Sequence, residues 1–225
     1  MANVSLYQFR TSPFCAKIRK ILDYKGIDYK LIEVDYVDRR NLLAASGQMM
    51  VPALTLPSGE TITESDVIAH RIEEAYPEPT IFPEHWRGIH IGLARYFDTE
   101  LEDVLFRAAV ADEIEHYRKL GHDREALWRL VRERKYGAGF CDQMVRDRAA
   151  NLDRAVTMLA PIDETLDRRA FLLGQIGYAD FALYGQLYYL GFTGEVKIPA
   201  QLANLRAFYD RMDRITAIIE TEGQS

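Results

Sequence analysis

The sequence has little cysteine, no long hydrophobic run and no large excess of either charge. Its two cysteines, Cys15 and Cys141, exclude a disulfide framework and indicate a reduced compartment, so we expect a cytoplasmic protein. The chain does not open on a basic segment and a long apolar stretch, and runs such as Phe181 to Leu183 are too short to cross a bilayer, which predicts no membrane role. The net charge of -6 over 225 residues disfavours nucleic acid as a partner, and we expect no metal.

Strand and helix signals alternate in the first third of the sequence. The apolar run Val4 to Phe9 predicts a strand, the segment Ala16 to Lys25 has helical spacing and stops at Gly26, and Tyr29 to Val34 predicts a second strand. Strand, helix and strand in this order are typical of a βαβ unit. We therefore expect the first domain to begin with a parallel pair of strands.

The pattern after this unit predicts a helix, a hairpin and another helix. Asp38 to Ala45 is polar and helical in character, and the strands Val51 to Leu56 and Thr61 to Thr63 flank the turn Pro57-Ser58-Gly59. Ser65 can cap the helix that follows. The first part of the chain is thus predicted to be βαβ-α-ββα.

A proline-rich stretch with Pro77, Pro79 and Pro83 marks the predicted boundary, with a first domain over 1–79, a linker over 80–85 and a second domain over 86–225. From Trp86 onward the strand signal disappears and apolar residues recur every three to four positions, which predicts an all-helical domain. Its later helices are expected over 178–190 and 199–212. We interpret its basic cluster, Arg129 to Lys135, as a solvated helix face and helix end, with no function assigned.

The tetrapeptide Ser12-Pro13-Phe14-Cys15 lies between the first predicted strand and the first predicted helix. It places a hydroxyl and a thiol at a helix N-terminus, where unpaired N–H groups and the helix dipole stabilise anions, thiolates included. The alternative is that Ser12 is simply an N-cap, with Pro13 at the first helical position. Both interpretations stay open on these residues alone.

Further motifs follow in order. They are Val51-Pro52-Ala53-Leu54, Glu64-Ser65-Asp66, Phe171-Leu172-Leu173-Gly174 and Ala179-Asp180-Phe181-Ala182. Together with Ser12-Pro13-Phe14-Cys15 and the predicted domains, they make the chain resemble the cytosolic glutathione transferases over nearly its whole length. The resemblance implies a thioredoxin-like domain followed by an all-helical domain, glutathione as co-substrate, and a homodimer.

The resemblance implies two candidate catalytic residues. Ser12 resembles the activating hydroxyl of the serine-type classes, which donates a hydrogen bond to the glutathione sulfur. Cys15 offers a rival chemistry, because the tetrapeptide is also similar to a glutaredoxin or omega-type motif whose first cysteine has become serine. Free cysteine is also among the most buried residue types, so Cys15 could instead be an inert packing residue.

The resemblance also implies glutathione-binding residues. Val51 and Pro52 match the position where a cis proline exposes the preceding backbone to the cysteinyl moiety, although a trans proline opening a strand is the local alternative. Glu64 and Ser65 would meet the γ-glutamyl ammonium and carboxylate, or would form a plain helix cap. Gln48 is a further candidate donor, and the lysine or arginine of other family members is missing near it, so the partner of the glycine carboxylate is unassigned.

The electrophile pocket of the family lies between the domains, so we expect Tyr96, Phe97, Phe106 and Tyr117 among its walls, with core packing as the alternative for each. Asp180 matches the family's N-capping box, which serves folding, although Gly177 replaces its usual Ser or Thr and cannot accept a hydrogen bond through a side chain. The loop between Gly174 and Asp180 is also shortened.

Three hypotheses about function remain. The first is a glutathione transferase that conjugates the glutathione thiolate to an apolar electrophile in the interdomain cleft, a detoxification chemistry. The second is a glutathione-dependent thiol/disulfide oxidoreductase. The third is a non-catalytic binding or scaffold module, because a fold alone does not decide function.

Overall fold

Four strands form one mixed sheet in the computed structural model, which describes residues 4–215. They are β1 (Val4–Gln8), β2 (Tyr29–Glu33), β3 (Ala53–Thr55) and β4 (Thr61–Thr63), in the spatial order β2-β1-β3-β4. β1 pairs in parallel with β2 and antiparallel with β3, and β3 pairs antiparallel with β4. A parallel pair requires a crossover, which α1 (Pro13–Tyr24) provides, so the predicted βαβ unit and hairpin are confirmed.

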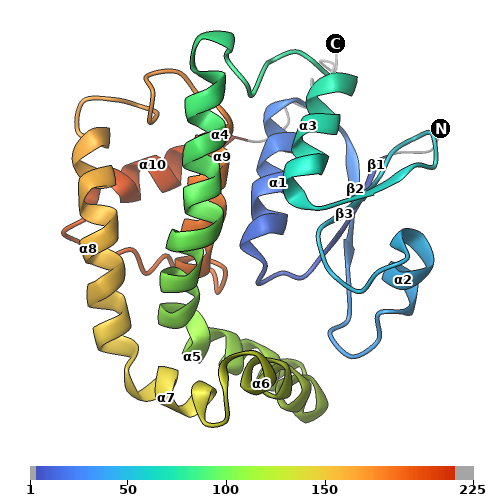
Figure 1. The fold of residues 1–225 in the computed structure, drawn as a ribbon, viewed down its shortest axis with the longest axis vertical. Helices are drawn as coiled ribbons and strands as arrows, with labels where there is room; N and C mark the ends of the chain where they lie inside the picture. The colour runs from blue at the N-terminus through green and yellow to red at the C-terminus, as the bar shows by residue number, and fades with distance from the viewer. Residues whose placement is uncertain (1–3, 216–225) are drawn as a thin grey trace, which may run out of the picture.

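Helices cover both faces of this sheet (Figure 1). α1 and α3 (Ser65–Ala75) pack on one face, and α2 (Arg40–Ser46) lies on the other. Ile18, Ile21 and Leu22 of α1 are completely buried, because their spacing of three and four places them on one side of the helix. The thioredoxin-like sheet therefore has a hydrophobic core between β1, α1 and α3.

The rest of the described chain is helical, as predicted. Its elements in chain order are η1 (Glu84–Trp86), α4 (Arg87–Tyr96), the π-helical turn η2 (Phe97–Leu101), α5 (Glu102–Leu120), α6 (His122–Tyr136), α7 (Phe140–Arg146), α8 (Arg148–Leu166), α9 (Tyr178–Leu187), η3 (Tyr188–Leu190) and α10 (Ala203–Asp213). Within residues 4–215, none of the helices has the length and apolar character needed to cross a membrane.

α9 lies at the centre of the helical part, and every one of its residues is buried. It packs against α1, where a Cβ on Gly185 would lie only 2.7 Å from the backbone oxygen of Pro13. A glycine is therefore required at this crossing, because any side chain would separate the two helices. The contact holds the first turn of α1 at a fixed position against the helical part.

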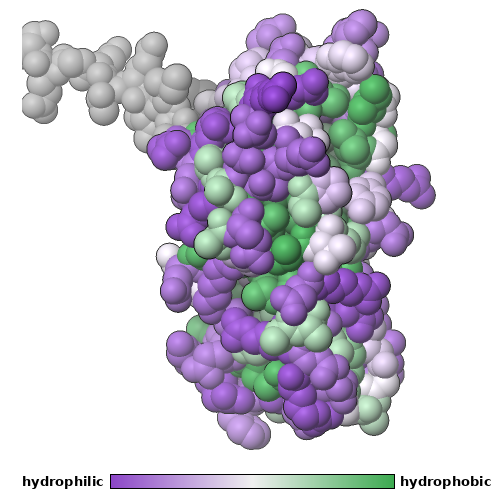
Figure 2. Space-filling model, turned by 90° about the vertical axis from the view of Figure 1, so that its left-hand side faces the viewer, coloured by the Kyte–Doolittle hydropathy of each residue, from purple (hydrophilic) through white to green (hydrophobic). Residues whose placement is uncertain are grey.

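The outer side of the helical part is mostly hydrophilic, with hydrophobic side chains showing in patches between hydrophilic ones (Figure 2). α8 lies on this side and is amphipathic. Its Ala155, Leu159 and Leu166 are buried, whereas most of its other residues are half-buried or exposed. These three residues form the inner face of the helix.

Several predicted boundaries differ from the structure. α1 already begins at Pro13, because the fixed φ of proline suits the first helical position. The helix predicted over 178–190 ends at Leu187 and continues as a 3-10 turn. α10 begins at Ala203 instead of Pro199, because the chain first forms a turn in which the Leu202 N–H donates to the Pro199 carbonyl at 2.9 Å.

Candidate active site

Ser12 lies in the connection from β1 to α1 and caps the N-terminus of α1. Its Oγ accepts a hydrogen bond from the backbone N–H of Cys15 at 3.3 Å. The first turn of α1 holds no acidic side chain, so the positive end of the helix dipole is not neutralised there. Because the cap uses the hydroxyl oxygen as an acceptor, the O–H is left to donate. The cap and the predicted sulfur donor are therefore compatible roles for one side chain.

Cys15 has a very different environment, although it is only one turn further along α1. Its side chain is completely buried, and burial raises the pKa of its thiol to about 12. Cys141 is buried as well. Burial is the main cause that raises the pKa of its thiol to about 12, and the neighbouring Glu133 carboxylate adds to it. A protonated, buried thiol is a poor nucleophile. The structure thus disfavours exchange chemistry at Cys15.

The Val51–Pro52 peptide bond is cis, as the family resemblance implies. Val51 is half-buried and Pro52 is buried, immediately before β3. Ala53 pairs with Thr63 across the β3–β4 hairpin. This register brings the Val51–Pro52 segment and the junction between β4 and α3 to the same end of the sheet.

The β4–α3 junction carries a backbone feature that the sequence does not reveal. Glu64 has a φ of 67°, the one positive φ outside glycine in residues 4–215. Residues other than glycine adopt this region rarely, and often at ligand sites. Ser65 then begins α3 and is half-buried at a helix N-terminus, where an anion is stabilised.

A cavity of about 300 Å³ lies between the sheet domain and the helical part. Ser12 and Val51 line one wall, and residues of α5, α6 and η3 line the other. The lining includes Phe9, Thr11, Ser12, Phe14, Tyr36, Arg39 and Val51 from the first part, and Glu102, Phe106, Glu113, Tyr117, Arg132, Lys135, Tyr136 and Tyr189 from the helices. Gln48, Glu64 and Ser65 lie outside this lining, at the edge of the sheet domain.

Of the four aromatic residues predicted as pocket walls, Phe106 and Tyr117 line the cavity. Tyr96 and Phe97 do not. Tyr96 is 41% exposed at the end of α4, and Phe97 is buried in the hydrophobic core at the start of the π-helical turn. The family resemblance implies only which segment holds the pocket wall, and the π-helical turn changes the residues-per-turn count between Phe97 and α5.

The helical wall of the cavity is charged, which corrects the interpretation of the cluster Arg129 to Lys135 as a solvated face. Arg129 does point outward, to Glu125 and Asp142 at 3.0 Å each. Arg132 instead points inward, and its Nη1 donates to the Tyr36 hydroxyl at 2.8 Å. Because an α-helix has 3.6 residues per turn, Arg129 and Arg132 do not point in the same direction. One basic run therefore contacts two different surfaces.

Arg39 is a further candidate site residue, which the sequence alone does not indicate. Its Nη1 donates to the backbone oxygen of Met49 at 2.9 Å, and its guanidinium stacks on Phe9 and Tyr36 with centroid distances of 4.8 and 4.5 Å. Among residues 4–215 no carboxylate forms an ion pair with it, although it lines the cavity beside Val51. The fold therefore brings a cation to the position near Met49 where the sequence has none.

Two family models match this chain: the glutathione S-transferase N-terminal domain over residues 6–80, and the glutathione S-transferase C-terminal domain over residues 143–211. The chain belongs to the glutathione S-transferase superfamily. A probable glutathione S-transferase from Solanum tuberosum is 29% identical to it over 199 residues, which are 87% of this chain and 77% of the relative.

Solved structures of the glutathione S-transferase superfamily and of a glutaredoxin have the same fold. A glutathione S-transferase from Rhodospirillum rubrum F11 is 24% identical, with a TM-score of 0.70 over 94% of this chain and 88% of that one. Glutaredoxin 2 from Salmonella typhimurium, solved in complex with glutathione, is 20% identical, with a TM-score of 0.73 over 97% and 96% of the two chains. At these identities the likeness establishes the architecture.

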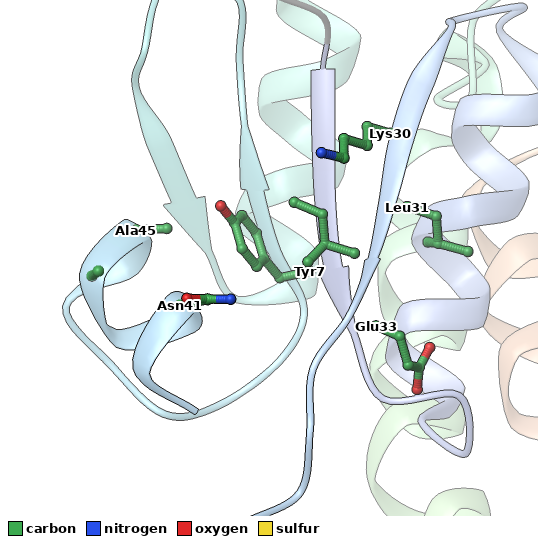
Figure 3. A pocket seen from close by; sticks show the side chains of 8 residues that line it. Tyr7, Lys30, Leu31, Glu33, Asn41 and Ala45 are labelled. Carbon is green, nitrogen blue, oxygen red and sulfur yellow. The ribbon is translucent and has the colours of Figure 1, made fainter. Parts of the chain in front are cut away.

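This superfamily member has another surface depression at the open edge of its sheet, between β1, β2 and α2 (Figure 3). Tyr7 and Asn41 lie between the sheet and α2, whereas Leu31 and Glu33 lie apart from them. Its polar groups do not converge, and none of the predicted site residues lines it. The cavity beside Ser12 is therefore the better candidate site.

Proposed function

We propose that this superfamily member is a glutathione transferase, which binds glutathione beside Ser12 and directs its thiolate at an electrophile in the cavity between the two parts of the chain. One observation carries the proposal: a single cavity is lined by Ser12 on one wall and by Phe106 and Tyr117 on the other. Two reactants held together in this way gain from proximity as well as from sulfur activation.

Glutathione would bind along the edge of the thioredoxin-like sheet. The backbone N–H and C=O of Val51 would pair with the cysteinyl moiety, and Ser65 and Glu64 would receive the γ-glutamyl carboxylate and ammonium. Arg39 would hold the glycine carboxylate, since its guanidinium lines the cavity without an ion-pair partner in the described chain. Gln48, just beyond α2, would be a further donor.

Ser12 would activate the sulfur. An unperturbed thiol has a pKa of about 8.5 and is mostly protonated at neutral pH. The Ser12 O–H and the N-terminus of α1 both stabilise a thiolate placed beside them, and so lower this pKa. The thiolate then forms the new C–S bond with an electrophilic carbon of the second substrate, whose leaving group or conjugated carbonyl takes the displaced electron pair.

The deciding experiment is a titration of the protein with glutathione across pH, with the thiolate absorbance as the readout. A hydrogen bond to a charged group contributes about 1.5–3 kcal/mol, so Ser12→Ala should raise the pKa of the bound thiol by about 1 to 2 units. Cys15→Ala is the control and should leave that pKa in place. A bound thiol with an ordinary pKa in the unmodified protein would favour disulfide exchange, and no binding would favour a scaffold.

We also propose that two copies of the chain associate, in the cytoplasm, where thiols are kept reduced. Support comes from an apolar stripe on the outer side of α4, where Ile89 and Tyr96 are exposed seven residues apart, with the half-buried Leu93 between them. Trp86 extends this stripe before the helix, and it is also exposed. Exposed apolar side chains gathered on one side of a helix are typical of an interface between proteins.

A further inference from the structure

Glu113 is a buried carboxyl group on the cavity wall opposite Ser12. It lies in the middle of α5, is 2% exposed, and lines the cavity. Its Oε2 has no hydrogen-bond partner among the described residues. The nearest cation, Nη2 of Arg132, is 3.8 Å away, and that guanidinium donates to the Tyr36 hydroxyl instead. One oxygen of this buried acid therefore lacks a hydrogen bond, and a single guanidinium faces it at 3.8 Å.

An unsatisfied buried carboxyl group is costly, and it is more so when ionised. Burial therefore raises the pKa of Glu113 to about 7. The Arg132 guanidinium, the Thr11 hydroxyl and the Trp128 indole oppose this effect, and Glu102 adds to it. At neutral pH a large fraction of Glu113 carries a proton. A protonated carboxyl group donates a hydrogen bond, and an acid with a pKa near the working pH is suited to general acid catalysis.

We propose that Glu113 donates a hydrogen bond and then its proton to the carbonyl oxygen of the second substrate, so that α,β-unsaturated carbonyl compounds are the preferred electrophiles. This inference rests on the proposed transferase function, because it needs a thiolate held at Ser12. The two groups line opposite walls of one cavity, Ser12 from the β1–α1 connection and Glu113 from α5.

The step balances without any further reactant. The thiolate forms a C–S bond at the β-carbon, the π pair of the C=C bond moves onto the conjugated carbonyl, and the enolate oxygen takes the proton of Glu113. The enol then becomes the ketone, and the Glu113 carboxylate recovers the proton that the next glutathione thiol gives up. Displacement of a halide from an aromatic ring differs, because the halide leaves as an anion and needs no proton.

Two electrophiles with these two mechanisms test the proposal: trans-4-phenyl-3-buten-2-one, an enone, and 1-chloro-2,4-dinitrobenzene, an aryl halide. General acid catalysis contributes roughly 10²-fold or more, so Glu113→Gln should lower kcat/KM for the enone about 100-fold and change it about twofold or less for the aryl halide. Glu115→Gln is the matched control, because Glu115 lies on the outer face of α5 and pairs with Arg118. It should leave both values unchanged.

A measurement on the unmodified enzyme keeps the test independent of folding of the variant. The ratio of the enone rate to the aryl halide rate cancels the titration of the thiol, and it should fall as pH rises through about 7, where Glu113 loses its proton. In Glu113→Gln the ratio should be flat, which separates Glu113 from Glu102, the other carboxyl group in the cavity. The remaining titratable groups facing Glu113 are Arg132, Tyr36, Tyr117 and Tyr189.

Equal losses with both electrophiles in Glu113→Gln would overturn the proposal, since they would mean a packing role. A ratio that does not change with pH in the unmodified enzyme would overturn it as well. If the unmodified enzyme binds no glutathione and converts neither electrophile, the proposed function itself fails, and that result is distinct from the other two.

Discussion

At the scale of single residues, Ser12 and Arg39 show that the candidate site combines a residue placed by its sequence neighbours with one placed by the fold. Ser12 could be predicted because everything that defines it, a strand end, a proline and a helix start, lies within a few residues of it. Arg39 could not be predicted in the same way. Its relation to Met49 depends on how the chain turns through α2, which brings the two within 2.9 Å. The polar character of the helix predicted over 38–45 is the one available signal.

The role of Arg39 can be tested with its neighbour Arg40 as the control. If its guanidinium holds the glycine carboxylate, Arg39→Gln should weaken glutathione binding about tenfold, or about 1.4 kcal/mol, by calorimetry. Arg40→Gln is the control, since Arg40 is exposed and pairs with Asp38 outside the cavity. γ-Glutamylcysteine, which lacks the glycine, should bind the unmodified protein and Arg39→Gln equally. A loss of the same size with this shorter ligand would rule out the assignment.

Glu113 and Arg132 show the same limit at the charged wall. Each is unremarkable in its own helix, one among several acidic positions of α5 and one in a basic run of α6. Only the packing of α5 against α6 brings them to 3.8 Å and turns them toward the cavity. Periodicity indicates which residues share a face of one helix. It does not indicate which two helices will form a wall together.

At the scale of elements, the N-terminus of α9 shows why a family motif can change without loss of its function. Asp180 Oδ2 accepts the Gly177 N–H at 2.9 Å, and its Oδ1 accepts the Leu172 N–H at 2.9 Å. The cap side chain that Gly177 lacks is replaced from another helix, because Nδ1 of His90 on α4 accepts the Ala179 N–H at 3.3 Å. Burial lowers the pKa of His90, so its imidazole is neutral and Nδ1 is free to accept.

This arrangement predicts that Gly177 and His90 are energetically coupled. A Cβ on Gly177 would lie 2.3 Å from the His90 ring, so Gly177→Ser should destabilise the fold by about 1–3 kcal/mol through overpacking. In a His90→Ala background the same serine has room and can cap α9 itself, so its cost should largely disappear. Urea unfolding of the two single variants and the double variant measures the coupling. Strictly additive free energies would contradict it.

Element order was predictable because each strand and helix has its own period and its own turn or cap residues. Element ends were less so, since they depend on tertiary contacts. The apolar spacing from Trp86 to Leu105 indicates one amphipathic helix, yet the structure divides it into α4, a π-helical turn and α5. The turn places Asp98 against Lys17 of α1 at 2.5 Å, a partner that lies in the other domain and leaves no local signal.

At the scale of the whole molecule, the two parts of the chain are joined by a buried polar network as well as by apolar packing. Lys17 is 1% exposed at its side chain and contacts Asp98, the Tyr178 hydroxyl at 3.2 Å and Asp66 at 3.3 Å. These residues come from α1, η2, α9 and α3, so one ammonium group ties four elements together. Breaking a buried ion pair leaves an uncompensated charge. The network therefore fixes how the helical wall faces Ser12.

The outer stripe of α4 predicts how two copies of the chain associate. Ile89 is 47% exposed on this stripe, and Val145 on α7, at the other end of the helical part in Figure 1, is 44% exposed. If α4 forms the contact between two copies, Ile89→Glu places a charge inside the interface and should yield a monomer of 25.9 kDa in sedimentation equilibrium. Val145→Glu, an equally exposed apolar residue given the same charge, should stay at twice that mass, like the unmodified protein. If the unmodified protein is monomeric, there is no such contact. If the two variants behave alike, the contact lies elsewhere, because a charge is tolerated outside an interface but not at its centre.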